Sequence, residues 1–421
     1  MPNARPKICV LYHFFHPDDV VSARHFSDLA EGFVKAGWDV EVLPSNRACR
    51  NGSKQYPARE NWRGMQIHRI WRPGWNQSST VGRLLNAAWM LAAWSRLALR
   101  SRARRPDVVL VGTDPVLSVL VALPLKWLRP DIPVAHWAFD LYPEAAIADG
   151  LLASSGRKVR FLTTLLRRAY QSCNLIADLG ACMQQRLKAY DPGLALETIV
   201  PWALSEPPEP ESSDPALRRL VFGDTPLAIL YSGNLGRAHS FQEFLALARS
   251  LRSSGAQFRW SVRGNAVEAL RAAIEPGDTN VRILPFVEEA ELRAHLAAAD
   301  IHMVSLKPDW SGIVVPSKFF GSLAAGRPVL FAGPEDSAVA RWIRQHRVGW
   351  VLNGSNQEEA DAWLRHLAAS PELLADLQNR CHAVYRKHFS REQMIALWVR
   401  ELDRLARLEQ RQSRTAPIGT S

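Results

Sequence analysis

The segment Val-Pro-Ser-Lys-Phe-Phe-Gly-Ser-Leu-Ala-Ala-Gly-Arg-Pro-Val-Leu-Phe-Ala-Gly-Pro-Glu-Asp occupies residues 315–336 and determines the fold we expect. Pro316 suits the start of a helix, and Gly326 suits the position just after a helix end. The apolar run at 328–332 then has the length and composition of a buried strand. We therefore expect a loop, a short helix, a glycine turn, a strand and a second glycine turn.

Such a helix start is also a candidate anion site. The backbone N–H groups of a first helical turn lack partners within the helix, so they can hold a negatively charged group. Ser317 and Lys318 would add a hydroxyl and a cation beside them. The alternative is an ordinary strand–helix unit whose lysine is solvated.

The same alternation of short apolar runs and longer periodic segments extends along the chain, which is typical of parallel sheets with crossover helices. A chain of 421 residues is too long for one typical core, so we expect two such domains. Their ligands would bind in a cleft at the carboxyl ends of the strands. The expected boundaries are a first domain at 1–205, a proline-rich linker at 206–225, a second domain at 226–388, a crossover helix at 389–410 and a flexible tail at 411–421.

Charge is concentrated in the first half of the chain. The net charge is +11, and residues 1–205 hold 26 Lys and Arg against 16 Asp and Glu, which leaves +10 in that half. Its basic clusters lie beside apolar residues in two expected helices, near 84–105 and 157–170, a pattern that favours an anionic membrane surface over nucleic acid. The alternative for either helix is a solvated basic face. The clusters are Arg96, Arg100, Arg102, Arg104 and Arg105, and Arg157, Lys158, Arg160, Arg167 and Arg168.

Cysteine usage and hydropathy limit the possible location of the protein. Five scattered cysteines without short paired spacings argue against a zinc site or a disulfide framework and favour a reducing compartment. The most apolar runs are shorter than the roughly 20 residues that a bilayer-spanning helix needs, and no secretory segment opens the chain. We expect a cytoplasmic protein that is peripheral on the inner face of the plasma membrane.

A second glycine-containing loop follows the first expected strand of the second domain. Gly233 and Gly236 in Ser-Gly-Asn-Leu-Gly-Arg-Ala-His-Ser allow a sharp turn and a close approach to a ligand. Arg237 and His239 would reach a phosphate above the following helix start. The loop lacks the full G-x-G-x-x-G spacing, so a tight strand–helix turn is the alternative.

Together, the Tyr-Ser-Gly-Asn-Leu-Gly-Arg-Ala loop, the Pro-Ser-Lys loop and the Ala-Ala-Gly-Arg-Pro-Val turn resemble the C-terminal domain of retaining family 4 glycosyltransferases. The chain looks most similar to the bacterial colanic-acid and O-antigen fucosyl- or N-acetylfucosaminyl-transferase branch. The resemblance implies a GT-B fold, with two Rossmann-like domains that face each other across a cleft and a last helix that returns to the first domain. It further implies a nucleotide-sugar donor bound by Gly233, Asn234, Gly236, Arg237, His239, Ser317, Lys318, Glu335 and Asp336.

The sequence also departs from the family pattern. Family members carry two glutamates before the Ala-Ala-Gly turn, and Ile313 and Gly321 stand in their places. The family's Arg and Lys in the first loop are replaced by Asn234 and His239. Arg237 and Lys318 are then the cations left to hold a diphosphate, because a nucleotide leaving group needs charged partners. Glu335 and Asp336 could contact ribose or sugar hydroxyls, with a helix N-cap as the alternative.

In the first domain, three residues are the candidate catalytic groups. Asp140 in Phe-Asp-Leu-Tyr-Pro-Glu matches the Asp of the family's His-Asp-Leu-x-Pro motif, and Glu144 follows four residues later. Asp140 could deprotonate an acceptor or stabilise positive charge at the anomeric carbon, and helix capping is the alternative. His16 lies in Tyr-His-Phe-Phe-His-Pro-Asp-Asp, where the family has a glycine-rich loop, together with the weaker candidates His13 and Asp18.

We therefore predict a glycosyltransferase without metal or other cofactor that transfers a sugar from a nucleotide-sugar to a lipid-linked polyprenyl diphosphate saccharide. The alternatives are a sugar-nucleotide 2-epimerase of the same architecture and a non-catalytic subunit of a polysaccharide-assembly complex. Nucleic acid is not an expected partner.

Overall fold

The computed structural model describes residues 5–77, 79–100 and 105–415. The chain divides into two compact units. Unit 1 comprises Met1–Val200 and Met394–Ser421, and unit 2 comprises Pro201–Gln393.

Unit 1 is built on a mainly parallel sheet whose described strands follow the order β3-β4-β2-β1-β5-β6-β7-β8. Its central strands are buried along their whole length, which explains their mainly apolar sequence. The strands span Lys7–Leu11 (β1), Asp39–Val42 (β2), Arg59–Trp62 (β3), Met65–His68 (β4), Val108–Gly112 (β5), Val134–Trp137 (β6), Leu175–Asp178 (β7) and Leu196–Thr198 (β8).

One sheet edge differs from the expected parallel arrangement. Strand β3 pairs antiparallel with β4, and the connection between them places Arg63 and Gly64 at positive φ angles of 47° and 84°. Because β3 is a short polar edge strand, its sequence carries no apolar run, and the strand was not predicted.

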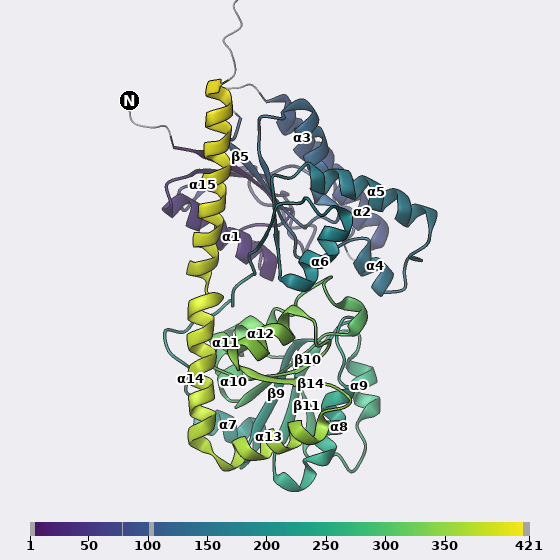
Figure 1. The fold of residues 1–421 in the computed structure, drawn as a ribbon, viewed down its shortest axis with the longest axis vertical. Helices are drawn as coiled ribbons and strands as arrows, with labels where there is room; N and C mark the ends of the chain where they lie inside the picture. Colours follow the sequence, from purple (N-terminus) through teal and green to yellow (C-terminus); the bar gives the residue numbers. More distant parts are fainter. Residues whose placement is uncertain (1–4, 78, 101–104, 416–421) are drawn as a thin grey trace, which may run out of the picture. The chain divides into compact units, whose positions relative to one another are not determined.

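Helices cover both faces of the unit 1 sheet (Figure 1). Helices α2, α3 and α5 gather on one face, where α2 and α5 both contact the 3₁₀ segment η3. Helices α1 and α15 lie on the other face, and Trp398 of α15 packs edge-on against Trp137. These helical segments span Val21–Lys35 (α1), Thr80–Ser95 (α2), Arg96–Leu99 (η1), Ser118–Val121 (η3), Ala122–Leu128 (α3), Glu144–Ala148 (α4), Arg157–Gln171 (α5), Ala181–Tyr190 (α6) and Arg391–Thr415 (α15).

Unit 2 contains a parallel sheet whose described strands follow the order β11-β10-β9-β12-β13-β14. The strands span Ala228–Asn234 (β9), Gln257–Arg263 (β10), Val281–Leu284 (β11), Ile301–Ser305 (β12), Val329–Ala332 (β13) and Gly349–Leu352 (β14). The helical segments are Pro215–Phe222 (α7), Gln242–Ser250 (α8), Arg252–Ser254 (η4), Val267–Ala273 (α9), Glu289–Ala297 (α10), Pro308–Trp310 (η5), Lys318–Ala324 (α11), Ala338–His346 (α12), Gln357–Ala369 (α13) and Pro371–His388 (α14). The loops after β9, β12 and β13 share one edge of this sheet because the three strands are parallel neighbours.

The segment expected to be a linker at 206–225 is part of unit 2. The carbonyl of Pro207 accepts a hydrogen bond from His382 of α14, and the carbonyl of Glu211 accepts one from Arg327. Residues 215–222 form helix α7, with Asp214 capping the N–H of Ala216. Prolines prevent a ladder of backbone hydrogen bonds here, so side chains of unit 2 satisfy the carbonyls instead.

The last helix returns to unit 1. Helix α15 begins at Arg391, and from Met394 onward the chain belongs to unit 1. A Cβ on Gly32 of α1 would lie only 2.5 Å from the side chain of Ile395, so the missing side chain permits this close packing. The helix extends to Thr415, beyond the expected end at 410, and residues 416–421 of the predicted tail lie outside the described residues.

Candidate functional site

The segment at 315–336 has the predicted order of elements. Helix α11 spans Lys318–Ala324, Gly326 has a φ of 71°, and β13 follows at Val329–Ala332. Ser317 is the N-cap residue, but its side chain makes no capping hydrogen bond, and the residue is exposed. Ser317, at the start of α11, therefore faces solvent within unit 2.

Lys318 connects this segment with the glycine-containing loop. Its ammonium group donates a 2.9 Å hydrogen bond to the carbonyl of Asn234, 84 residues earlier, and lies 5.2 Å from the ring centroid of Tyr231. Desolvation lowers the pKa of Lys318 to about 8, although the residue keeps some exposed surface. An ammonium with one carbonyl partner has further N–H groups available for an anion. Lys318 is therefore a partly desolvated cation at the point where the two predicted loops meet.

The glycines of the first loop make room for this contact. Gly233 has a φ of 118°, and a Cβ there would lie 3.0 Å from Cε of Lys318. A Cβ on Gly236 would lie 2.9 Å from Nδ2 of Asn234. A side chain at either position would thus press on Lys318 or on Asn234, and the loop requires glycine at 233 for its backbone angle as well.

His239 has a structural role that the sequence did not indicate. Its Nδ1 lies 2.8 Å from the carbonyl oxygen of Ser305, so Nδ1 must carry the proton and donate. Burial, and then the positive charge of Lys318, lowers the pKa of His239 to about 4. His239 is therefore neutral at physiological pH and joins the β9 loop to the end of β12, but it does not replace the missing cation of the family pattern.

The remaining donor-site candidates lie on the surface of unit 2. Arg237 is exposed on the β9 loop. The Glu335 carboxylate is engaged by Asn353 and by Arg344, with distances of 2.5 and 2.9 Å. The carboxylate of Asp336 makes no hydrogen bond or ion pair within the described part of the chain. The cap of α12 is Ser337, whose hydroxyl accepts from the N–H of Ala340, so the capping alternative for Asp336 is wrong.

The two positions that lack the family's glutamates differ in their surroundings. Ile313 is buried in the apolar interior of unit 2. Gly321 lies within α11, and a Cβ built on it would meet no atom within 4 Å. The chain therefore has room for a side chain at 321, whereas position 313 has become part of the core.

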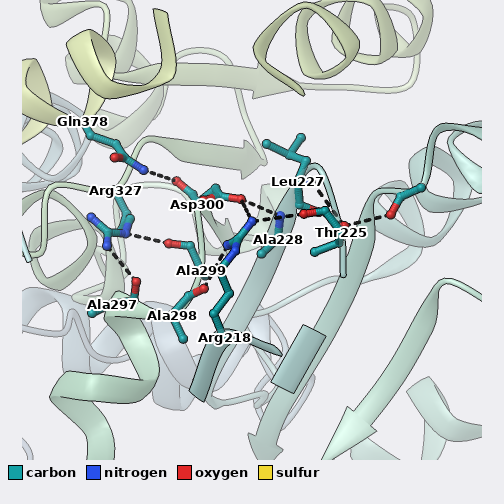
Figure 2. A network of polar contacts seen from close by, with 11 residues as sticks. Arg218, Thr225, Leu227, Ala228, Ala297, Ala298, Ala299, Asp300, Arg327 and Gln378 are labelled. Carbon is teal, nitrogen blue, oxygen red and sulfur yellow. Dashed lines mark hydrogen bonds and ion pairs between the residues drawn. The ribbon is translucent and has the colours of Figure 1, made fainter. Parts of the chain in front are cut away.

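Arg327 of the Ala-Ala-Gly-Arg-Pro turn stabilises unit 2 internally (Figure 2). Its guanidinium is buried and donates to the carbonyl oxygens of Ala297 and Ala299, at 2.7 and 2.6 Å. It also donates to the carbonyls of Ala325 and Glu211. This part of the motif thus fixes the end of α10, the turn and the segment before α7, and its arginine does not point to a ligand.

In unit 1, Asp140 lies in the loop after β6, beside a second carboxylate. The hydroxyl of Thr113 donates to the carbonyl of Trp137 and accepts from the N–H of Phe139, which fixes the start of this loop. Asp140 keeps exposed surface, but desolvation by the surrounding protein, and then the negative charge of Asp114, raises its pKa to about 6. Helix α4 begins at Glu144 without a side-chain cap, so the capping alternative for Asp140 is also wrong.

The other two catalytic candidates are engaged by neighbouring side chains. Glu144 accepts a 2.6 Å hydrogen bond from the hydroxyl of Tyr190, and its second carboxylate oxygen is buried. The imidazole of His16 stacks on Trp62 at 4.0 Å, and burial lowers its pKa. Within the described part of the chain, no hydrogen bond joins His16 to Asp140 or Glu144.

Two residues at this sheet edge were not selected from the sequence. Asp114 follows β5 in Gly-Thr-Asp-Pro and lies 3.5 Å from Nδ1 of the buried His13. Arg72 is fully buried, and its Nε donates to the hydroxyl of Ser45. An acidic residue directly after an apolar strand was the available signal for Asp114. Arg72 carried no signal because its burial depends on tertiary packing.

Some residues of the predicted basic clusters form ion pairs with carboxylates. Arg100 pairs with Glu41 and Arg105 pairs with Asp131, whereas Arg102 and Arg104 lie outside the described residues. No ion pair is formed by the basic residues of α5 in the described structure. Among the helices that the structure describes, none combines the length and apolar character needed to cross a bilayer. The described residues also contain no group of His, Cys, Asp and Glu suited to hold a metal ion.

The sequence is similar to those of known glycosyltransferases. Residues 22–201 match the family model of a glycosyl transferase 4-like domain. The chain is 28% identical over 263 residues to the probable glycosyltransferase WbjE of Pseudomonas aeruginosa, an alignment that covers 60% of this chain and 64% of that relative. It is 24% identical over 338 residues to the putative colanic acid biosynthesis glycosyl transferase WcaI of Escherichia coli K12, which covers 76% and 81% of the two chains.

The solved structures extend the likeness over the whole fold. Sucrose-phosphate synthase from Thermosynechococcus elongatus aligns with a TM-score of 0.67 at 12% identity, over 95% of this chain and 99% of that one. HepE of Anabaena in complex with UDP-glucose aligns with a TM-score of 0.59 at 14% identity, over 94% and 99%. The predicted GT-B fold is confirmed. Residues 22–201 are similar to a glycosyl transferase 4-like domain, whereas the two loops on which the predicted resemblance rests lie outside this segment. The fucosyl- or N-acetylfucosaminyl-transferase branch stays a prediction.

Proposed function

We propose that this protein, with its GT-B fold and its glycosyl transferase 4-like segment, is a glycosyltransferase of surface polysaccharide biosynthesis. It would move a sugar from a nucleoside diphosphate donor to a lipid-linked polyprenyl diphosphate saccharide, with retention of anomeric configuration. The name of its relative WcaI supports the polysaccharide context, and the UDP-glucose complex of HepE supports a nucleotide-sugar donor.

The observation that carries the proposal is the contact between Lys318 and the loop after β9. This contact brings a cation, a glycine backbone at positive φ and an exposed helix start to one place on unit 2. A departing nucleoside diphosphate needs donors and positive charge aimed at its phosphate oxygens. Lys318 would supply that charge, and Ser317 and Arg237 would supply further donors from the surface.

Ribose or sugar hydroxyls need acceptors, and Asp336 is the better of the two predicted candidates. Its carboxylate has no partner within the described residues, whereas the Glu335 carboxylate is already held by Asn353 and Arg344. A hydroxyl could donate to the carboxylate of Asp336 without breaking any hydrogen bond or ion pair of the described protein. We therefore assign this role to Asp336.

Unit 1 would hold the acceptor. Its sequence carries most of the net positive charge, which suits a diphosphate-bearing lipid. Asp140, with a pKa raised to about 6, can accept a proton from an acceptor hydroxyl near neutral pH. The cationic side chains replace a metal ion in this proposal, so no cofactor is required, and the enzyme would work at the inner face of the plasma membrane.

The test uses the full chain and a panel of nucleoside diphosphate sugars. A matching donor should raise the melting temperature by mass action, and turnover should then require membranes that contain a lipid-linked saccharide. Turnover should persist in the presence of EDTA. A sugar nucleotide that changes without any acceptor would contradict the transfer reaction, and complete loss of turnover with EDTA would contradict the metal-free mechanism.

A further inference from the structure

Helix α2 of unit 1 has an apolar face that the described protein does not cover. Six large apolar side chains on α2 and the loop before it each expose between 36% and 68% of their surface. These residues form what we call the aromatic face: Trp71, Trp75, Val81, Leu84, Leu85 and Trp89. Soluble proteins rarely expose a contiguous apolar patch of this kind unless it meets a partner.

The aromatic face is held in shape by its own contacts. Trp71 and Trp75 each meet Trp89 edge-on, with ring centroids 5.4 and 6.3 Å apart. The indole N–H of Trp89 donates a 2.7 Å hydrogen bond to the carbonyl of Trp71. These contacts thus hold the three indole rings in an exposed position.

Next to the aromatic face lies a basic cavity of about 340 Å³. Two lining residues join it to the face: Ile70 precedes Trp71, and Ala93 lies one helical turn after Trp89. Among its other lining residues, Arg69 and Arg100 are paired with Glu60 and Glu41. Arg59 and Arg96 also line the cavity, and within the described residues neither forms an ion pair.

The charge pattern of this region identifies the partner. Residues 61–106 contain nine arginines and five tryptophans but no Asp or Glu. Helix α5, on the same side of the sheet as α2 (Figure 1), adds the exposed Phe161, which follows Arg157, Lys158 and Arg160 in the sequence. Exposed tryptophans flanked by cations and free of carboxylates fit the interface of an anionic bilayer, where indoles lie at the headgroup level.

We infer that the aromatic face docks on an anionic phospholipid bilayer and that the cavity between Arg59 and Arg96 receives a lipid phosphate. This inference names the membrane contact of the proposed function. It is tested separately from donor binding, because donor binding is measured without lipid.

The first experiment measures sedimentation of the full chain with vesicles of phosphatidylcholine alone or with roughly one third phosphatidylglycerol, at about 0.1 M salt. The variant Trp71→Gln/Leu84→Gln should bind anionic vesicles at least about tenfold more weakly, since interfacial binding scales with buried apolar area. The matched control Leu220→Gln/Leu373→Gln removes exposed apolar side chains from unit 2 and should bind like the wild type.

The second experiment separates the cavity from general charge. Arg59→Gln/Arg96→Gln should lose at least about fivefold of the preference for anionic over neutral vesicles. The control Arg271→Gln/Arg282→Gln removes the same amount of charge from unit 2 and should keep the wild-type preference for anionic vesicles. Donor-induced thermal stabilisation should be unchanged in all four variants.

Three results would overturn the inference. One is a wild-type chain that does not sediment with anionic vesicles, and another is equal binding by the aromatic-face variant and its control. The third is a lipid-free dimer that Trp71→Gln/Leu84→Gln converts to a monomer, because the face would then cover a second copy of the chain. If no nucleoside diphosphate sugar raises the melting temperature of the wild type, that result would instead count against the proposed function.

Discussion

At the scale of single residues, the structure changes the roles of the predicted cations. Lys318 and His239 were both selected as donor-binding residues, yet the surroundings leave one charged and the other neutral. Lys318 keeps a pKa of about 8, so its ammonium predominates at pH 7. His239 has a pKa of about 4, and its Nδ1–H donates a hydrogen bond to the carbonyl of Ser305. Of these two residues, only Lys318 can supply positive charge for a diphosphate at neutral pH.

We predict that Lys318→Met weakens donor binding by at least about 1 kcal/mol, because a charged hydrogen bond to phosphate is lost. In the wild type the donor affinity should fall roughly tenfold between about pH 7 and pH 9, as the lysine deprotonates above its lowered pKa. Isothermal titration with the donor that gives the largest thermal shift measures both effects.

Lys387→Met, which removes a lysine from α14, should bind the donor like the wild type. If Lys318→Met keeps both the affinity and its pH dependence, Lys318 is only a structural link between the two loops.

Asp140 is the residue for which we expect a catalytic effect. Asp140→Asn should lower kcat by at least about a hundredfold while donor binding is retained, since a positioned general base contributes about 10²–10⁴. The wild-type rate should rise with pH through about 6, where Asp140 ionises. In Asp114→Asn this rise should move to lower pH, because the neighbouring negative charge that helps to raise the pKa is removed. If the pH profile of Asp114→Asn is unchanged, the ionisation that controls the rate is not that of Asp140.

At the scale of elements, the segment at 315–336 combines a part that faces solvent with a part that stabilises unit 2. The first half, through Lys318, contacts the end of β9, and the second half, through Arg327, donates hydrogen bonds to five backbone carbonyls. The sequence motif runs through both halves and does not reveal this division. Arg327 is buried and Lys318 is only half-buried because different parts of unit 2 pack over each of them.

Arg327→Leu should lower the free energy of unfolding by at least about 3 kcal/mol, because several buried carbonyls lose their donor at about 1–3 kcal/mol each. Urea unfolding monitored by tryptophan fluorescence measures the change. As a control, Arg344→Leu removes an exposed arginine paired with Glu335 and should cost less than about 1 kcal/mol. Equal effects for the two variants would contradict a structural role for Arg327.

Helix α11 offers a prediction of the opposite sign. Gly321→Ala should raise the free energy of unfolding by about 0.5–1 kcal/mol, because glycine is the less favourable residue inside a helix. The added Cβ meets no atom within 4 Å, so no steric cost offsets the gain. A destabilised variant would show that this position is more crowded than the structure indicates, and donor binding by the same variant shows whether the open space is used.

At the scale of the whole molecule, buried neutral histidines link stability to pH. Burial lowers the pKa of His302 to about 3, and the ring bridges Ser322 and the carbonyl of Leu296. A histidine with a depressed folded-state pKa stabilises the fold above its usual pKa of about 6.5, and this contribution is lost as the pH falls toward the folded value. In unit 1, Asp178 has a raised pKa, so its protonation stabilises the fold as the pH falls and opposes the effect of the histidines. We therefore expect unit 2 to show the clearer loss of stability at low pH.

We predict that the wild type loses stability between about pH 7 and pH 4 and that His302→Gln loses about 3 kcal/mol less over the same interval. Urea unfolding at the two pH values measures this difference. The glutamine stays neutral at both values, so the variant isolates the titration of His302 from the loss of its hydrogen bonds at neutral pH. The same pH dependence in both proteins would assign the acid sensitivity to other groups.

The sequence by itself determined the two parallel-sheet domains with their crossover helices and the loops of the candidate donor site. These features follow from local rules, since apolar runs, helical periods and glycine turns act within a few residues of each other. It did not reveal β3, whose polar edge residues lack an apolar pattern, nor the attachment of the proline-rich segment to α14.

Only the tertiary structure decided which polar residues act on ligands and which hold the fold. Lys318 and Asn234 are 84 residues apart, and the electrostatic effect of Asp114 on Asp140 depends on β5 and β6 lying side by side. Likewise, the apolar residues of α2 appear in the sequence as a helix core, and only packing shows that one of its faces is left exposed. Burial and long-range contacts set the charge, partners and accessibility of a side chain, and no local pattern encodes them.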